Sequence, residues 1–159
     1  MSQALVQGVQ DFVQAEARLL NQARYQDWLA LFAPDGRYWV PLGGDVQSES
    51  DTHNALANED RLLLTLRVER LLAGRAHSQQ PASRSAHVLQ LPQVDVCNDQ
   101  RAEVYTPFTY VESRGEQQIW LAGQWCHRLC REQGAWRIAL KRVNLLNAGA
   151  AHPAIQLFP

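Results

Sequence analysis

Apolar residues recur at helical spacing along the first third of the chain. Between residues 3 and 21 they are separated by Gln, Glu and Arg and predict an amphipathic helix; they are Leu5, Val9, Phe12, Val13, Leu19 and Leu20. A shorter helix is predicted over residues 26–32, ended by the turn-forming residues 34–36. A third helix is predicted from Asn58, a suitable N-cap, to Gly74, a suitable stop. Its expected buried stripe is Leu62, Leu63, Leu66, Leu71 and Leu72.

After residue 85 the apolar period changes from 3.6 residues to about two. Four alternating runs follow, over residues 87–91, 104–110, 119–125 and 136–140, with Gly115 and Gly134 as turn residues between them. Residues 37–42 predict an earlier strand, and the polar segments 43–57 and 74–85 predict loops. Helices followed by a meander of strands indicate an α+β fold in which helices cover one face of a curved, mixed or antiparallel sheet.

Composition narrows the function classes. The chain has 159 residues, of which 46% are apolar and 19% charged, so we expect one globular domain over residues 1–159. The formal net charge of −1 argues against a nucleic-acid partner. Three cysteines and the absence of a signal-peptide pattern or a membrane-length apolar run predict a cytoplasmic protein.

Several short strings, in order along nearly the whole chain, resemble the β subunits of aromatic-ring-hydroxylating dioxygenases. They are Glu16-Ala17-Arg18-Leu19-Leu20, Tyr38-Trp39-Val40-Pro41, Asp60-Arg61, Leu66-Arg67-Val68, Arg70-Leu71, Pro81-Ala82-Ser83-Arg84 with His87, Leu121-Ala122-Gly123 and Trp136-Arg137-Ile138-Ala139. After the Ala-Gly of the late strand many members have two basic residues followed by an acid, whereas this chain reads Gly123-Gln124-Trp125-Cys126-His127. Many members also have an aromatic residue where this chain has His77. Contacts that those side chains make in other members are therefore not expected here.

The resemblance implies a cone-shaped, nuclear transport factor 2-like fold with three N-terminal helices. It also implies a small, non-catalytic subunit that binds a larger α subunit in an α3β3 hexamer, with β–β contacts in a homotrimer. The α subunit would carry a Rieske [2Fe-2S] cluster and mononuclear Fe(II), and this chain would carry no cofactor. On the same grounds we expect interface contacts from Arg67, Arg70, Arg84 and His87.

The chemistry-bearing residues agree with a chain that holds no metal. A Rieske centre needs two cysteines and two histidines, and a mononuclear iron site needs three convergent ligands. The five histidines are scattered, and Cys126 and Cys130 fall on a predicted strand rather than on turns. We therefore expect neither a metal site nor catalytic residues in this chain.

Two other functions stay open at the sequence level. One is a stand-alone isomerase, dehydratase or cyclase of the related SnoaL-like proteins, acting on a hydrophobic ring compound, with His87, Asp35 and Asp51 as pocket candidates. It predicts an acid directed into an open apolar cavity, and a packed interior with no inward Asp or Glu would exclude it. The other is a non-enzymatic small-ligand or adaptor domain that uses the mouth of the cone and forms a homodimer without a large partner.

Overall fold

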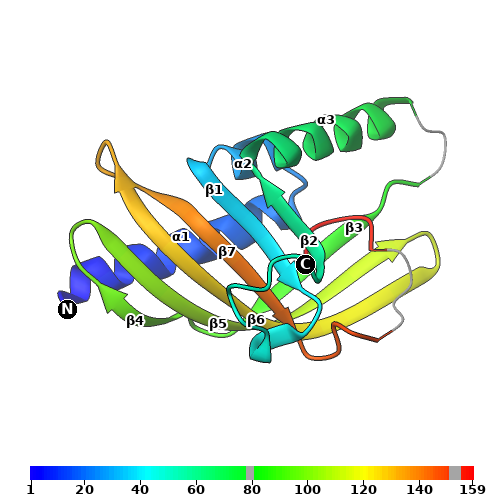
Figure 1. The fold of residues 1–159 in the computed structure, drawn as a ribbon. Helices are drawn as coiled ribbons and strands as arrows, with labels where there is room; N and C mark the ends of the chain where they lie inside the picture. Colours follow the sequence, from blue (N-terminus) through cyan, green and yellow to red (C-terminus); the bar gives the residue numbers. More distant parts are fainter. Residues whose placement is uncertain (78–80, 151–154) are drawn as a thin grey trace.

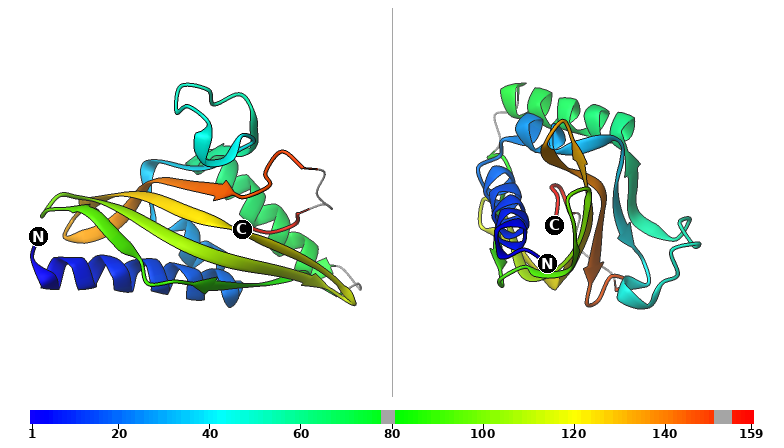
Figure 2. Two further views of the ribbon diagram at one scale, coloured as in Figure 1. Left: turned by 90° about the horizontal axis from the view of Figure 1, so that it is seen from below. Right: turned by 90° about the vertical axis from the view of Figure 1, so that its left-hand side faces the viewer.

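A strongly curved sheet wraps around the long N-terminal helix, and a second long helix covers one end (Figures 1 and 2). This computed structural model describes residues 1–77, 81–150 and 155–159. Seen end-on in Figure 2, the C-terminus lies inside the ring formed by the sheet and α1. The core therefore lies between the concave face of the sheet and the helices.

All three predicted helices are present. They are α1 (Gln3–Asn21), α2 (Tyr25–Leu29) and α3 (Arg61–His77), with a short 3-10 turn η1 (Gly44–Val46). The buried side of α1 carries Val9, Val13 and Leu20, as the spacing predicts.

The stripe predicted for the third helix was wrong, because Leu62, Leu63 and Leu66 are exposed and Leu64 and Val68 are buried instead. The start of α3 differs from the prediction, because Asp60 rather than Asn58 caps it: the Asp60 carboxylate accepts the Leu63 amide hydrogen at 2.9 Å.

Within the described residues the sheet has seven strands, and it is mixed rather than purely antiparallel. They are β1 (Phe32–Pro41), β2 (Ala55–Asp60), β3 (Arg84–Leu89), β4 (Gln93–Cys97), β5 (Arg101–Arg114), β6 (Gln117–Glu132) and β7 (Ala135–Leu145). The order is β2-β1-β7-β6-β5-β3, and β4 also pairs with β5. The pairing of β1 with β7 is parallel and the other pairings are antiparallel. The predicted α+β class, with three helices on a curved mixed sheet, is confirmed.

Two predicted boundaries were wrong around β1 and β2. The turn residues 34–36 lie inside β1, where the pairing with β7 shifts register between Phe32 and Arg37. Residues 55–57, predicted as the end of a loop, form the start of edge strand β2 instead. In both places pairing with a neighbouring strand outweighs the local turn or loop preference.

A register shift in β7 decides which of its side chains face the core. Strand β6 pairs Arg128 with Leu140 and Leu129 with Ile138, so one residue of β7 is left over between them. Beyond this bulge the inward face changes to Lys141, Val143 and Leu145, and Leu140 is only partly buried. The simple alternation of residues 136–140 therefore does not continue, and a lysine enters the core.

Candidate functional site: the closed interior of the cone

The C-terminal residues of the chain fill the interior of the cone. The Phe158 side chain is 1% exposed, and its ring centroid lies 4.5 Å from that of Trp28. The rings of Tyr25 and Tyr38 lie 5.8 and 5.7 Å away. Aromatic contacts at these distances are typical of a packed core, so the space in which a cone-shaped enzyme would hold substrate contains a side chain of the protein itself.

Hydrogen bonds hold the backbone of this C-terminal tail, residues 155–159, in place. The Arg67 guanidinium donates to the Leu157 carbonyl oxygen at 2.8 Å, and Tyr38 donates its hydroxyl hydrogen to the Pro159 carbonyl at 2.9 Å. The buried carboxylate of Glu112 accepts the amide hydrogens of Gln156 and Leu157, both at 2.9 Å. The tail is thus tied to α3, β1 and β5, and the Glu112 carboxylate is occupied by it.

His87, from β3, lies against the tail in the interior. Its ring nitrogens lie 2.8 Å from Asn21 Oδ1 and 3.0 Å from the Phe158 carbonyl oxygen. Burial, reinforced by the positive charge of Lys141, lowers the pKa of His87 to about 3. The imidazole is therefore neutral at pH 7 and donates to only one of the two oxygens at a time.

A second buried group of polar side chains connects α1, α2, β6 and β7. The carboxylate of Glu16 accepts from Trp28 Nε1 at 2.8 Å, from Lys141 Nζ at 2.6 Å and from His127 Nε2 at 2.7 Å. The side chains of Glu16, His127 and Lys141 are all 0% exposed. The Lys141 ammonium also lies 3.4 Å from the centroid of the Trp125 ring, a close cation–π contact.

The electrostatics of this group favour a fixed ion pair. Burial alone would raise the pKa of Glu16, but the charges and hydrogen bonds of Lys141 and His127 outweigh it and hold that pKa below its usual range. Burial lowers the pKa of Lys141, and attraction to Glu16 opposes the change. Because no member of the group is exposed to solvent, the arrangement stabilises the core and offers no group to a substrate.

No metal centre is found among the described residues: nowhere in ranges 1–77, 81–150 and 155–159 do three or more His, Cys, Asp or Glu side chains gather to hold an ion. Cys126 and Cys130 lie on β6, and burial raises the pKa of both thiols, which disfavours the metal-binding thiolate. His152 lies outside the described residues. Across the same described ranges, no helix has the length and apolar character that a membrane span requires.

Comparison with known proteins identifies the family to which the chain belongs. The sequence model of the ring hydroxylating beta subunit matches residues 15–150. The chain belongs to the family of ring-hydroxylating β subunits. It is 33% identical over 137 residues to the small oxygenase component of the p-cumate 2,3-dioxygenase system of Pseudomonas putida, an alignment that covers 84% of this chain and 75% of that protein.

Solved structures support the fold of this β subunit. A naphthalene 1,2-dioxygenase structure with indole bound in its active site aligns with a TM-score of 0.80, at 20% identity, over 100% of this chain and 88% of the other. The β subunit of the benzoate 1,2-dioxygenase from Burkholderia mallei aligns with a TM-score of 0.73, at 21% identity, over 87% of this chain and 89% of the other. At 20–21% identity, these likenesses establish the fold alone.

The arginines expected at interfaces occupy different settings in the β subunit. Arg67 is partly buried, forms an ion pair with Glu59 and contacts the tail. Arg70, on α3, and Arg84, at the start of β3, are exposed. The structure thus leaves two of the three arginines accessible to a partner, whereas Arg67 already has partners within the chain.

The pocket candidates of the enzymatic alternative do not converge. His87 is in the interior, Asp35 is exposed on β1, and Asp51 lies in the loop before β2, where its carboxylate accepts from Asn54 Nδ2 at 3.3 Å. These three described residues share no hydrogen bond or ion pair with one another. The arrangement therefore contains no acid–base pair built from them.

Sequence reasoning missed two inward carboxylates, Glu16 and Glu112, so the interior is packed but is not free of carboxylates. Both carboxylates are occupied by internal donors, and neither faces an open apolar cavity. One signal was available, since Lys141 is the only lysine of the chain and directly follows an alternating apolar run. A lone lysine in such a place requires a buried partner.

Proposed function

We propose that this chain is the small, structural subunit of a multicomponent aromatic-ring-hydroxylating dioxygenase in aromatic-compound catabolism. The observation that carries the proposal is the occupied cone: in a member of the β-subunit family, Phe158 fills the interior and the tail backbone is held by Arg67, Tyr38 and Glu112. A chain built in this way contributes shape and rigid surfaces rather than a reacting group.

The chemistry would belong to a catalytic α subunit. That subunit would carry the Rieske [2Fe-2S] cluster and the mononuclear Fe(II), receive electrons from NAD(P)H through a reductase, and add dioxygen to the ring. We place this chain, as a single domain, in a cytoplasmic α3β3 hexamer in which β subunits also contact one another. The low net charge gives no reason to add a nucleic-acid partner.

Exposed side chains on two elements are the proposed contact points. Helix α3 exposes Leu62, Leu63 and Leu66 (67%, 47% and 46% exposed) beside the charged Arg70, and Trp120 on β6 is 65% exposed. Large apolar side chains left in solvent are a feature of surfaces that other chains cover. Arg84 adds a forked donor suited to a carboxylate across such a surface.

Co-purification tests the proposal. An affinity-tagged chain is co-expressed with the Rieske-type α subunit encoded beside it, and the molar mass of the eluted material is measured by light scattering. We expect an equimolar complex with the mass of three α and three β chains, with iron present in the complex and absent from the tagged chain purified alone. An α subunit that is fully active and oligomeric without this chain would contradict the proposal.

A further inference from the structure

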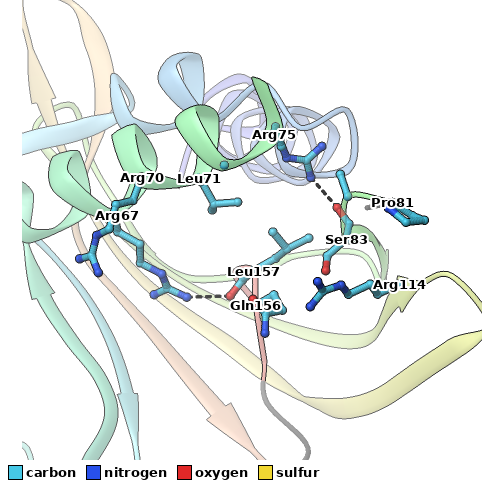
Figure 3. A pocket seen from close by; sticks show the side chains of 11 residues that line it. Arg67, Arg70, Leu71, Arg75, Pro81, Ser83, Arg114, Gln156 and Leu157 are labelled. Carbon is cyan, nitrogen blue, oxygen red and sulfur yellow. Dashed lines mark hydrogen bonds between the residues drawn. The ribbon is translucent and has the colours of Figure 1, made fainter. Parts of the chain in front are cut away.

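A cleft lies between α3 and the C-terminal tail, closed on its far side by residues 81–83, which precede β3, and by the end of β5 (Figure 3). Its volume is about 390 Å³. Four arginines line it, namely Arg67, Arg70, Arg75 and Arg114, together with apolar side chains that include Leu71 and Leu157. The cleft is separate from the packed interior, because Leu157 and the tail stand between the two.

The cleft concentrates positive charge, and two of its arginines have no ion-pair partner among the described residues. Arg67 pairs with the carboxylate of Glu59, but Arg75 reaches only neutral acceptors, the Ser83 carbonyl and the Tyr25 hydroxyl. For Arg70, the described part of the chain provides no hydrogen bond or ion pair. The lining residues include no carboxylate, and the sequence outside the described ranges has none either.

The buried carboxylate of Glu112, two residues before Arg114 on β5, is directed away from the cleft. Glu112 accepts the amide hydrogens of Gln156 and Leu157, so it faces the tail backbone. Arg70 and Arg75 therefore form no ion pair with a carboxylate of the described residues. The formal net charge of the whole chain is −1, so this local excess of positive charge is specific to the cleft.

Shape and charge together define a ligand class. Guanidinium groups present forked donors that match the two oxygens of a carboxylate, and the walls supplied by Leu71 and Leu157 exclude water from an apolar body. The volume falls within the range of small-molecule sites. We propose that this cleft binds an organic acid, a carboxylate carried on a compact apolar body such as an aromatic ring. This goes beyond the proposed structural function and involves no reaction.

Calorimetric titration of the full chain with benzoate tests the proposal, since benzoate is a simple ring carboxylate. Benzyl alcohol, which has the ring without the charge, and acetate, which has the charge without the ring, are the matched ligands. We expect saturable binding of benzoate, at least about tenfold tighter than that of either control. Equal affinity for benzoate and benzyl alcohol, or no binding of benzoate, would overturn the proposal.

Two charge reversals locate the site. Arg70→Glu places a negative charge at the cleft, and Arg84→Glu makes the same change on an exposed arginine that does not line it. Because both side chains are exposed, we expect both variants to fold with unchanged circular dichroism. Benzoate affinity should fall about tenfold or more in Arg70→Glu and stay within about twofold in Arg84→Glu. Equal losses in the two variants would refute the assignment.

Assembly provides a separate outcome. If the isolated chain binds benzoate in the cleft but the complex with the α subunit does not, the cleft receives an acidic side chain of the partner, and the small-acid proposal is wrong. If both forms bind benzoate with the same affinity, the proposal is supported. Both of these results require the complex, which the co-purification establishes separately. The titration of the isolated chain and the two charge reversals do not require it, so failure of the proposed function and failure of the cleft proposal are distinguishable.

Discussion

Replacing Glu16 by Gln should destabilise the protein more than any other single isosteric change in the core. The substitution keeps the volume of the side chain but removes the negative charge that Lys141 Nζ contacts at 2.6 Å and His127 Nε2 at 2.7 Å. Both partners are fully buried, so the Lys141 ammonium would be left without a counter-charge in the core. Breaking a buried ion pair in this way costs about 3–5 kcal/mol.

That loss is large on the scale of the whole protein. Domains have free energies of unfolding of about 5–15 kcal/mol, so the variant would lose at least about a fifth of its stability. For a chain of this length the same loss lowers Tm by roughly 6–20 °C. Urea denaturation at pH 7, followed by tryptophan fluorescence, measures the free energy directly. The matched control is Glu116→Gln in the exposed β5–β6 turn, which should leave the midpoint unchanged.

A double variant separates loss of charge from loss of packing. Glu16→Gln combined with Lys141→Met removes both charges, so no uncompensated ammonium remains, and the double variant should be more stable than Glu16→Gln alone. If Glu16→Gln unfolded at the same urea concentration as the Glu116→Gln control, or if the second substitution only added to the loss, the reasoning about the buried ion pair would be refuted.

Three further predictions concern the tail, the sheet and pH. Phe158→Ala should cost about 3–5 kcal/mol in urea denaturation, whereas Leu146→Ala, at a residue that is 75% exposed, should not shift the midpoint. Gly123→Ala should prevent normal folding, because the added Cβ would overlap a backbone carbonyl of β7. Gly74→Ala, on α3, meets open space and should stabilise the protein by about 0.5–1 kcal/mol. Thermal melts followed by circular dichroism check both variants. The natural protein should have its full stability advantage over Glu16→Gln above about pH 4.3, the pKa of a Glu side chain in the unfolded chain. The advantage should shrink as the pH falls below that value, because the pKa of Glu16 is lowered in the folded protein. An equal difference in free energy of unfolding between the two proteins at pH 3 and at pH 7 would contradict the direction of that shift.

The sequence predicts local structure well where one period persists over many residues. The buried face of α1 and the long alternation that became β5 and β6 follow directly from side-chain spacing. Strands β2 and β4 were missed because each is short and lies beside a stronger turn or loop signal. Short edge strands depend on pairing with a neighbour more than on their own residues.

The interior network could not be predicted in the same way, because it joins distant parts of the chain. Glu16 and Lys141 are 125 residues apart, and the bulge in β7 is what turns Lys141 inward. Local spacing places Leu140 on the buried face, so periodicity alone would turn Leu140 rather than Lys141 into the core. The tail is a similar case, since Phe158 reaches Trp28 and Tyr38 only after the sheet has curved around them.

The central claim is that the interior of this chain takes no part in the reaction of the enzyme. His87→Gln and Glu112→Gln alter two of the interior ionisable groups that contact the tail. Each variant is assembled with the α subunit and assayed for ring dihydroxylation per mole of mononuclear iron. The account predicts turnover within about twofold of the natural complex for every variant that assembles. A complex that is fully assembled and iron-loaded but has lost turnover would contradict it.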